Sequence, residues 1–165
     1  MYKRQDNRGC QIVDTTCGDV MRVWKRVRNY SKQGYTSVIH GKADHEETRA
    51  TASRAYDNFG SHYLVILTIE DCEYVCQFIE NGGDKNKFLE KFEGSFSPGF
   101  DPLIHLSKIG VANQTTMLKG ETEKIQQMLF ESIKTRDGDK AEENFQFFDT
   151  ICGATQERQD ALFEM

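Results

Sequence analysis

Apolar residues along this chain follow two spacings, one typical of buried strands and the other typical of helices. Short runs of apolar and β-branched side chains predict strands, and apolar residues that recur every three or four positions predict helices between them. Glycine, proline and asparagine separate many of these segments. Strands are expected at residues 11–14, 35–39, 62–68, 108–112 and 145–148, and helices at 20–33, 48–56, 71–80, 119–134 and 155–165.

The alternation of strands with helices predicts an α/β fold. A mainly parallel sheet with flanking helices is the expected architecture, because parallel strands need crossover connections between them. A polar stretch with glycine and proline at 94–102 indicates an insertion in the region 82–105. In folds of this class ligands bind beside the carboxyl ends of the strands, so functional residues are expected in the loops that follow strands.

Composition narrows the classes of partner. The chain has 165 residues, a net charge of −5 and a pI near 5.4. Such an acidic chain is poorly suited to bind nucleic acid or an anionic membrane. No apolar stretch reaches the length of a membrane span, and the first residues lack the apolar segment of a signal peptide. We therefore expect a soluble, intracellular protein.

Five cysteines, an odd number, do not suggest the disulfide framework of a small secreted domain. Cys72 and Cys76 lie at helical spacing among apolar residues and are expected to be buried thiols. Cys10 precedes a strand and would lie at the wrong edge of the sheet. Cys17 and Cys152 follow strands and precede helices, and a helix N-terminus favours the thiolate form.

The segments that lead to these last two thiols resemble each other. Val-Asp-Thr-Thr-Cys at 13–17 and Phe-Asp-Thr-Ile-Cys at 148–152 both run from an apolar strand to a cysteine. We expect two related units that present a thiol in the same way. Their separation of 135 residues (152 − 17) is too long for a zinc ribbon. A module that binds zinc or forms a disulfide, with no further chemistry, is an alternative interpretation.

Two polar loops follow predicted strands. Residues 40–48, His-Gly-Lys-Ala-Asp-His-Glu-Glu-Thr, include two imidazoles, two adjacent carboxylates and a lysine, and Asn113–Thr116 carry four neutral hydrogen-bonding side chains. Caps and turns alone explain such residues in a non-enzymatic interaction domain. The functional interpretation is that His45 binds an anionic group while a neighbouring carboxylate moves protons.

Taken together, four motifs resemble the LytB (IspH) family of 4-hydroxy-3-methylbut-2-enyl diphosphate reductases, in its plant and cyanobacterial form. The motifs span most of the chain, and the last two are long and nearly verbatim. They are VDTTC ending at Cys17, HGKxxHEET starting at His40, NQTTMLKGET starting at Asn113 and DTICxATQERQDA starting at Asp149. The last predicted helix has no C-capping glycine, so we expect an internal fragment of such an enzyme.

The resemblance implies an α/β protein of three lobes, arranged as a trefoil, in which each lobe gives one cysteine to a central 4Fe-4S cluster. Cys17 and Cys152 match the second and third of these ligands, and the first lies outside this chain. Residues 1–16 would end the first lobe, residues 17–148 would form the middle lobe, and residues 149–165 would begin the last. Three thiolates leave one iron open to a substrate oxygen.

The resemblance also implies roles for single residues. His45 matches the histidine that binds the substrate diphosphate, and Glu47 matches the glutamate that delivers a proton. Thr115 matches the threonine that orients the hydroxyl relay, with Gln114 and Thr116 in support. The implied reaction reduces an allylic diphosphate to isopentenyl and dimethylallyl diphosphates, with ferredoxin or flavodoxin as electron donor, in the cytoplasm or the plastid stroma.

The chain also departs from the family pattern. The histidines of the first lobe and a late Ser-x-Asn motif for the diphosphate lie outside it, and Gly18 stands where the family usually has proline. With two of three thiolates and half of a diphosphate site, this chain is expected to be inactive alone.

Overall fold

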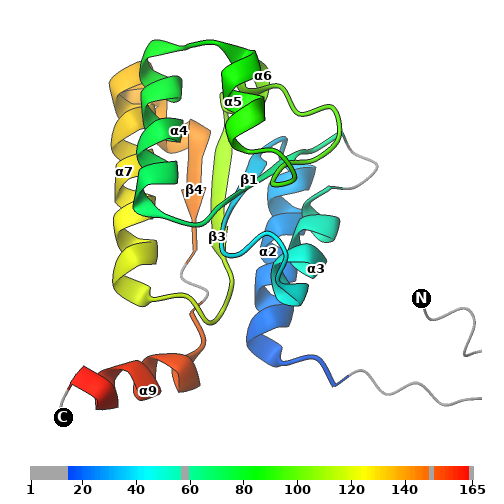
Figure 1. Cartoon of the computed structure of the whole chain (residues 1–165), viewed down its shortest axis with the longest axis vertical. Helices are drawn as coiled ribbons and strands as arrows, with labels where there is room; N and C mark the ends of the chain where they lie inside the picture. The colour runs from blue at the N-terminus through cyan, green and yellow to red at the C-terminus, as the bar shows by residue number, and fades with distance from the viewer. Residues whose placement is uncertain (1–14, 57–59, 149–150, 164–165) are drawn as a thin grey trace, which may run out of the picture.

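Four parallel strands form the centre of the structure, a computed structural model that describes residues 15–56, 60–148 and 151–163 (Figure 1). The predicted strand at 11–14 lies outside the described residues. The four others are confirmed within a few residues at each end. They are β1 (Thr36–His40), β2 (Tyr63–Ile66), β3 (Ile109–Asn113) and β4 (Phe145–Phe147), in the order β2-β1-β3-β4.

The two central strands are buried along their whole length. All five residues of β1 and all five of β3 are buried, as expected for parallel strands that helices cover on both faces. Val38 pairs with Leu64 on one side and with Val111 on the other, which fixes the register. β4 is a short edge strand, and its last residue, Phe147, is 60% exposed.

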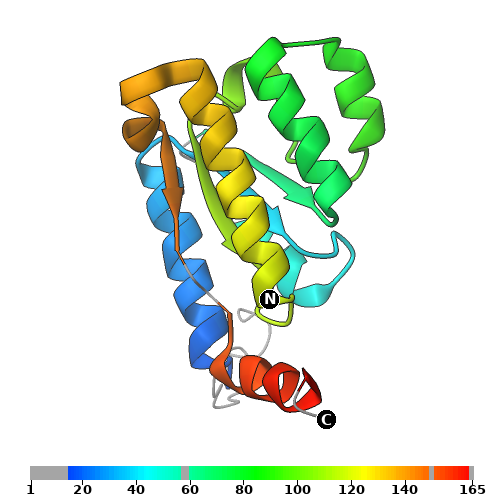
Figure 2. The ribbon, with the colours of Figure 1, turned by 90° about the vertical axis from the view of Figure 1, so that its left-hand side faces the viewer.

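Helices cover both faces of the sheet (Figures 1 and 2). Two pack on one face and two on the other, and the predicted helices are confirmed with small shifts of their ends. The first pair is α2 (Gly18–Lys32) and α3 (Glu46–Ala55), and the second is α4 (Ile69–Asn81) and α7 (Lys119–Asp137). The shorter helices are α5 (Lys85–Lys91), α6 (Pro102–His105), η1 (Gly138–Lys140), α8 (Ala141–Asn144) and α9 (Gly153–Phe163). None of the helices in the described part of the chain is long and apolar enough to cross a membrane.

The close packing of α2 on the sheet depends on Gly110. A Cβ atom at this position would lie 2.6 Å from the ring of Tyr30. Only glycine at position 110 therefore lets Tyr30 pack directly on β3. The ring of Tyr30 is fully buried, and its hydroxyl donates to the carbonyl oxygen of Val111 at 3.1 Å. Burial raises the pKa of Tyr30 far above its ordinary value. The phenol therefore stays neutral and holds α2 against β3.

The region 82–105 contains two helices that the sequence analysis did not predict. α5 has only seven residues, too few to show a helical period, and Asp84 caps it by accepting from the N–H groups of Asn86 and Lys87. Phe88 of α5 and Phe92, the C-cap residue that follows it, are buried against α4. The insertion therefore extends the core that α4 forms.

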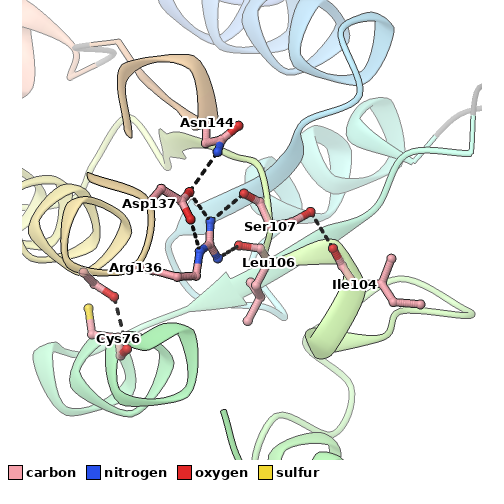
Figure 3. Close-up of polar contacts among 8 residues, drawn as sticks. Cys76, Ile104, Leu106, Ser107, Arg136, Asp137 and Asn144 are labelled. Atoms are coloured by element: carbon pink, nitrogen blue, oxygen red, sulfur yellow. Dashed lines mark hydrogen bonds and ion pairs between the residues drawn. The ribbon is translucent and has the colours of Figure 1, made fainter. Parts of the chain in front are cut away.

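Arg136, near the end of α7, ties the insertion to the rest of the domain (Figure 3). Its guanidinium donates to the carbonyl oxygens of Leu106 at 2.9 Å and Ser107 at 2.7 Å, and it also pairs with Asp137 at 2.7 Å. Asn144 donates to the same carboxylate at 2.8 Å. The adjacent Arg136 holds the pKa of Asp137 below its usual value. One planar cation thus connects α6, α7 and α8.

We expect Arg136→Lys to lower the free energy of unfolding by about 1–3 kcal/mol, because an ammonium cannot serve two carbonyls and a carboxylate in the same geometry. Urea unfolding of the chain measures the change. Arg22→Lys is the matched control, because Arg22 forms an exposed pair with Asp19 and should change stability by less than about 0.5 kcal/mol. Equal effects of the two substitutions would contradict a connecting role for Arg136.

Candidate functional site

The loops after β1 and β3 meet at the point where the chain order of the sheet reverses. From β1 the chain passes to α3 and then to β2, on one side of β1. From β3 it passes to α7 and then to β4, on the other side. Loops that leave neighbouring strands toward opposite faces open a crevice at the carboxyl edge, and in α/β sheets ligands bind there. The two polar loops of the sequence lie at this position.

Glu47 and Thr115 join these two loops directly. The Glu47 carboxylate accepts the Thr115 backbone N–H at 2.7 Å on Oε1 and the Thr115 hydroxyl at 3.0 Å on Oε2. Glu47 is half-buried in the first turn of α3, and Thr115 is 5% exposed. Both oxygens of the carboxylate are therefore engaged, and the Thr115 hydroxyl hydrogen points toward Glu47.

The side chain of Gln114 forms a second set of hydrogen bonds between the two loops. Its side-chain oxygen accepts from the Thr48 hydroxyl at 3.1 Å and from the Lys42 backbone N–H at 3.2 Å, while its amide donates to the Thr116 hydroxyl at 2.6 Å. A Cβ atom at Gly41 would lie 2.8 Å from the Thr48 hydroxyl oxygen and 2.9 Å from Gln114 Cβ. Glycine at position 41 is therefore required for the two loops to approach each other.

His45 is the N-cap of α3. Its Nδ1 accepts the backbone N–H of Glu47 at 3.2 Å, and the ring is exposed. Because Nδ1 is an acceptor, the neutral ring carries its proton on Nε2, which is left to donate to a ligand. Position 45 therefore combines a free donor with the positive end of a helix dipole.

His40 is a residue of this region to which the sequence analysis gave no role of its own. It is the last residue of β1, fully buried, and its Nδ1 lies 2.9 Å from the hydroxyl oxygen of Thr122 in α7. That hydroxyl also donates to the carbonyl oxygen of Leu118, so the imidazole N–H donates to Thr122. Burial lowers the pKa of His40. A neutral histidine thus fixes the start of α7 behind the Gln114–Thr116 loop.

The two candidate cluster ligands lie at the same end of the molecule, where α2 and α9 begin (Figures 1 and 2). Cys17 is the exposed N-cap residue of α2. Cys152 is half-buried, its carbonyl accepts from the N–H groups of Thr155 and Gln156 at 3.0 Å each, and its own N–H donates to the Thr115 carbonyl at 3.3 Å. A backbone hydrogen bond therefore connects Cys152 to Thr115 and so to the Glu47–Thr115 pair. Cys17 lies at the same end of the fold.

The other thiols agree with their predicted structural role. Cys72 and Cys76 are buried between α4 and α7 with sulfurs 3.9 Å apart, and the hydrogen bond with Cys76 together with burial raises the pKa of Cys72 well above its usual value. Cys10 lies outside the described residues. Within the residues that the structure describes, no group of three or more His, Cys, Asp or Glu side chains could by itself hold a metal ion.

Comparison with known proteins gives consistent relatives. The family model described as LytB protein matches residues 1–165. Proteins named 4-hydroxy-3-methylbut-2-enyl diphosphate reductase are 48% identical over 161 residues in Cyanothece sp. and 51% identical over 162 residues in Crocosphaera subtropica. Each alignment covers 97% of this chain but only 38% or 39% of the relative, so the chain spans about two fifths of their length.

A solved structure shares the fold. The structure of (E)-4-hydroxy-3-methyl-but-2-enyl diphosphate reductase, described as the terminal enzyme of the non-mevalonate pathway, is similar with a TM-score of 0.61 and 19% sequence identity. The similarity covers 99% of this chain and 44% of that one, and supports the parallel α/β architecture. Because the family model matches the whole chain, the chain belongs to the LytB protein family.

Proposed function

We propose that this chain is part of an iron–sulfur reductase that converts 4-hydroxy-3-methylbut-2-enyl diphosphate into isopentenyl and dimethylallyl diphosphates. The observation that carries this proposal is the Glu47–Thr115 pair, which places an acid and a hydroxyl relay at the ligand-binding edge of the sheet. The relatives of this chain that are 48% and 51% identical to it bear the name of this enzyme. In the reaction the allylic C–O bond breaks, two electrons and two protons are taken up, and the oxygen leaves as water.

Cys17 and Cys152 are suited to hold a 4Fe-4S cluster together with a third cysteine from outside this chain. Both are free thiols beside the first residue of a helix, and cysteine is the ligand that such clusters need. When bound, the cluster supplies the electrons and an open iron that acts as a Lewis acid on an oxygen. The alternative, a zinc site or a disulfide, would leave the Glu47–Thr115 pair without a purpose.

Glu47 delivers the proton that turns the substrate hydroxyl into water. Hydroxide is a poor leaving group, so a positioned acid lowers the barrier to C–O cleavage. Thr115 Oγ1 and Glu47 Oε2 lie 3.0 Å apart. When Glu47 is protonated on Oε2, its O–H can donate to the Thr115 hydroxyl oxygen, and Thr115 then passes its own hydroxyl hydrogen to the substrate oxygen as it takes up the proton from Glu47. Gln114 holds Thr116 beside this relay, so the two hydroxyls keep a fixed relation to the acid.

His45 contributes to binding the diphosphate. Its Nε2 donor and the start of α3 favour negative charge, and Gln114 fixes the loop before it through Lys42 N–H. The remaining diphosphate ligands would come from outside this chain. In this proposal residues 17–148 form the middle lobe of three, residues 149–165 begin the last lobe, and the isolated chain has no turnover. The electron donor is a soluble protein such as ferredoxin or flavodoxin, in the cytoplasm or the plastid stroma.

In a full-length protein that contains this chain, Cys17→Ser or Cys152→Ser should remove most of the iron and sulfide after anaerobic reconstitution, because a hydroxyl is a poor substitute for a soft thiolate. Iron and acid-labile sulfide analysis measures the loss. Cys72→Ala and Cys76→Ala are the controls and should retain the cluster. Loss in the controls alone, or zinc without sulfide in the unmodified protein, would show that the ligands are wrongly assigned.

Glu47→Gln should lower kcat by about 10²- to 10⁴-fold with KM and cluster content little changed. The amide can still accept the Thr115 N–H, but it cannot supply a proton at neutral pH. Steady-state kinetics on the full-length enzyme measures the effect. Glu46→Gln is the control, because Glu46 is exposed and pairs only with Arg49 at 3.4 Å. An inactive Glu46→Gln enzyme beside an active Glu47→Gln enzyme would reverse the assignment.

His45→Asn should raise KM for the diphosphate substrate about 10-fold or more, since it removes one charge-assisted hydrogen bond of roughly 1.5–3 kcal/mol, while kcat changes little. Asparagine is a good N-cap, so α3 keeps its first turn and the variant separates binding from capping. Kinetics with varied substrate concentration tests this. An unchanged KM would exclude His45 from the diphosphate site.

A further inference from the structure

The exposed face of α2 is strongly basic although the chain as a whole is acidic. The fifteen residues of α2 include five basic side chains and one acidic side chain, whereas the whole chain has a net charge of −5. Part of this face borders a surface depression of about 540 Å³ between α2 and α3, which we call the basic groove. The basic groove is lined by Met21, Trp24, Lys25, Arg28, Asn29, Lys32 and Arg54.

Three cations of the basic groove have no acidic partner among the residues that the structure describes. Lys25, Arg28 and Lys32 are exposed and form no ion pair with any residue that the structure describes. Arg54 lies with its guanidinium carbon 3.4 Å from the centre of the Trp24 ring and donates to the Ala50 carbonyl. Within the described part of the chain, the groove therefore has an aromatic floor and an exposed rim of positive charge from Lys25, Arg28 and Lys32.

This face is poorly suited to a permanent interface with the rest of a larger protein. Lysine is depleted from the buried centres of stable interfaces, because its charge must lose water there. Other surfaces suit permanent contact better. Phe147 is 60% exposed on the edge strand β4, and Leu162 is 73% exposed on α9. The apolar surfaces thus favour permanent contact, and the basic groove favours a contact that forms and separates.

We propose that the basic groove is the docking surface for an acidic protein, and, resting on the proposed function, that this protein is the electron donor. The stripe from Met21 to Lys32 extends about 17 Å along α2, at 1.5 Å per residue. That length exceeds a single phosphate group and matches a row of carboxylates on a protein surface. Nucleic acid fits less well, because the negative field of the whole chain opposes a long polyanion.

The position of the groove agrees with electron delivery. α2 begins at Cys17, and Lys25 follows eight residues later, about 12 Å along the helix axis. A partner on this face is therefore close to the end of the fold that carries the candidate ligands. Contacts of exposed charges speed encounter and weaken with salt, so the complex forms and separates quickly, as repeated delivery of single electrons requires. Two reduced 2Fe–2S ferredoxins, each losing one electron, would supply the two electrons of one turnover.

The test uses the full-length enzyme with the double substitution Lys25→Glu and Arg28→Glu. The matched control is Lys87→Glu and Lys124→Glu, two exposed lysines of α5 and α7, across the sheet from α2, with no ion pair among the described residues. Turnover is driven either by a reduced 2Fe–2S ferredoxin of acidic pI or by a reduced viologen dye, and binding of the same ferredoxin is titrated by calorimetry over a range of ionic strength.

The groove variant should lose about 10-fold or more in kcat/KM for ferredoxin at low salt, with weaker binding and a flatter salt dependence, while dye-driven turnover is unchanged. The control should match the unmodified enzyme in every measurement. Equal losses in both variants, or unchanged ferredoxin binding in the groove variant, would overturn the docking surface. Loss of dye-driven turnover in the groove variant alone would show that other parts of the protein cover this face.

The two proposals fail in different ways. An unmodified enzyme that has no dye-driven turnover but binds ferredoxin through the groove would overturn the proposed function and leave the docking surface standing. Binding of a duplex oligonucleotide in preference to ferredoxin would overturn the choice of an acidic protein as the partner.

Discussion

The divergence of the chain after β1 and β3 is the constraint on which the candidate site depends. The two loops leave toward opposite faces of the sheet, and beyond the backbone bond from the Gln114 N–H to the His40 carbonyl at 2.8 Å, side-chain bonds hold them together. Glu47 accepts both the N–H and the hydroxyl of Thr115. Moving the carboxylate would break two charge-assisted bonds at once. Loops that are 68 residues apart in sequence therefore behave as one unit.

Thr115 transmits this constraint to the end of the chain. Its carbonyl accepts the Cys152 N–H, so the segment that leaves β4 is tied to the residue that Glu47 holds. His40, the last residue of β1, bonds to Thr122 and so fixes the first turn of α7 relative to the sheet. Glu47, Thr115 and Cys152 are in this way attached to the two central, fully buried strands. A site built on such a base keeps its geometry without relying on mobile loops.

The strands and long helices could be predicted from the sequence because each has enough residues to show its period. β1 and β3 consist of small or apolar side chains except for the polar residue that ends each strand, His40 and Asn113, and such a run is typical of a covered parallel strand. α5 could not be predicted, because seven residues held by one Asp84 cap leave no periodic signal. The bonds of Gln114, His40 and Arg136 join positions that are remote in sequence, and no local pattern encodes such pairs. The motifs named Gln114 as a candidate, but not that its side-chain oxygen accepts from both Lys42 and Thr48.

The exposed end of the site defines what the rest of the protein must supply. Cys17 and Thr116 are exposed, and β4 ends at an exposed Phe147 with an open edge. The proton relay that we propose would work efficiently only where bulk water is excluded, because water would compete with the Thr115 hydroxyl for Glu47. The same cover would bury the apolar edge of β4 and bring a third thiolate to the two present here. In the proposed function, closure of the site, completion of the cluster and protection of the sheet edge would therefore occur in one packing event, to which this chain would contribute Cys17, Cys152 and the edge of β4.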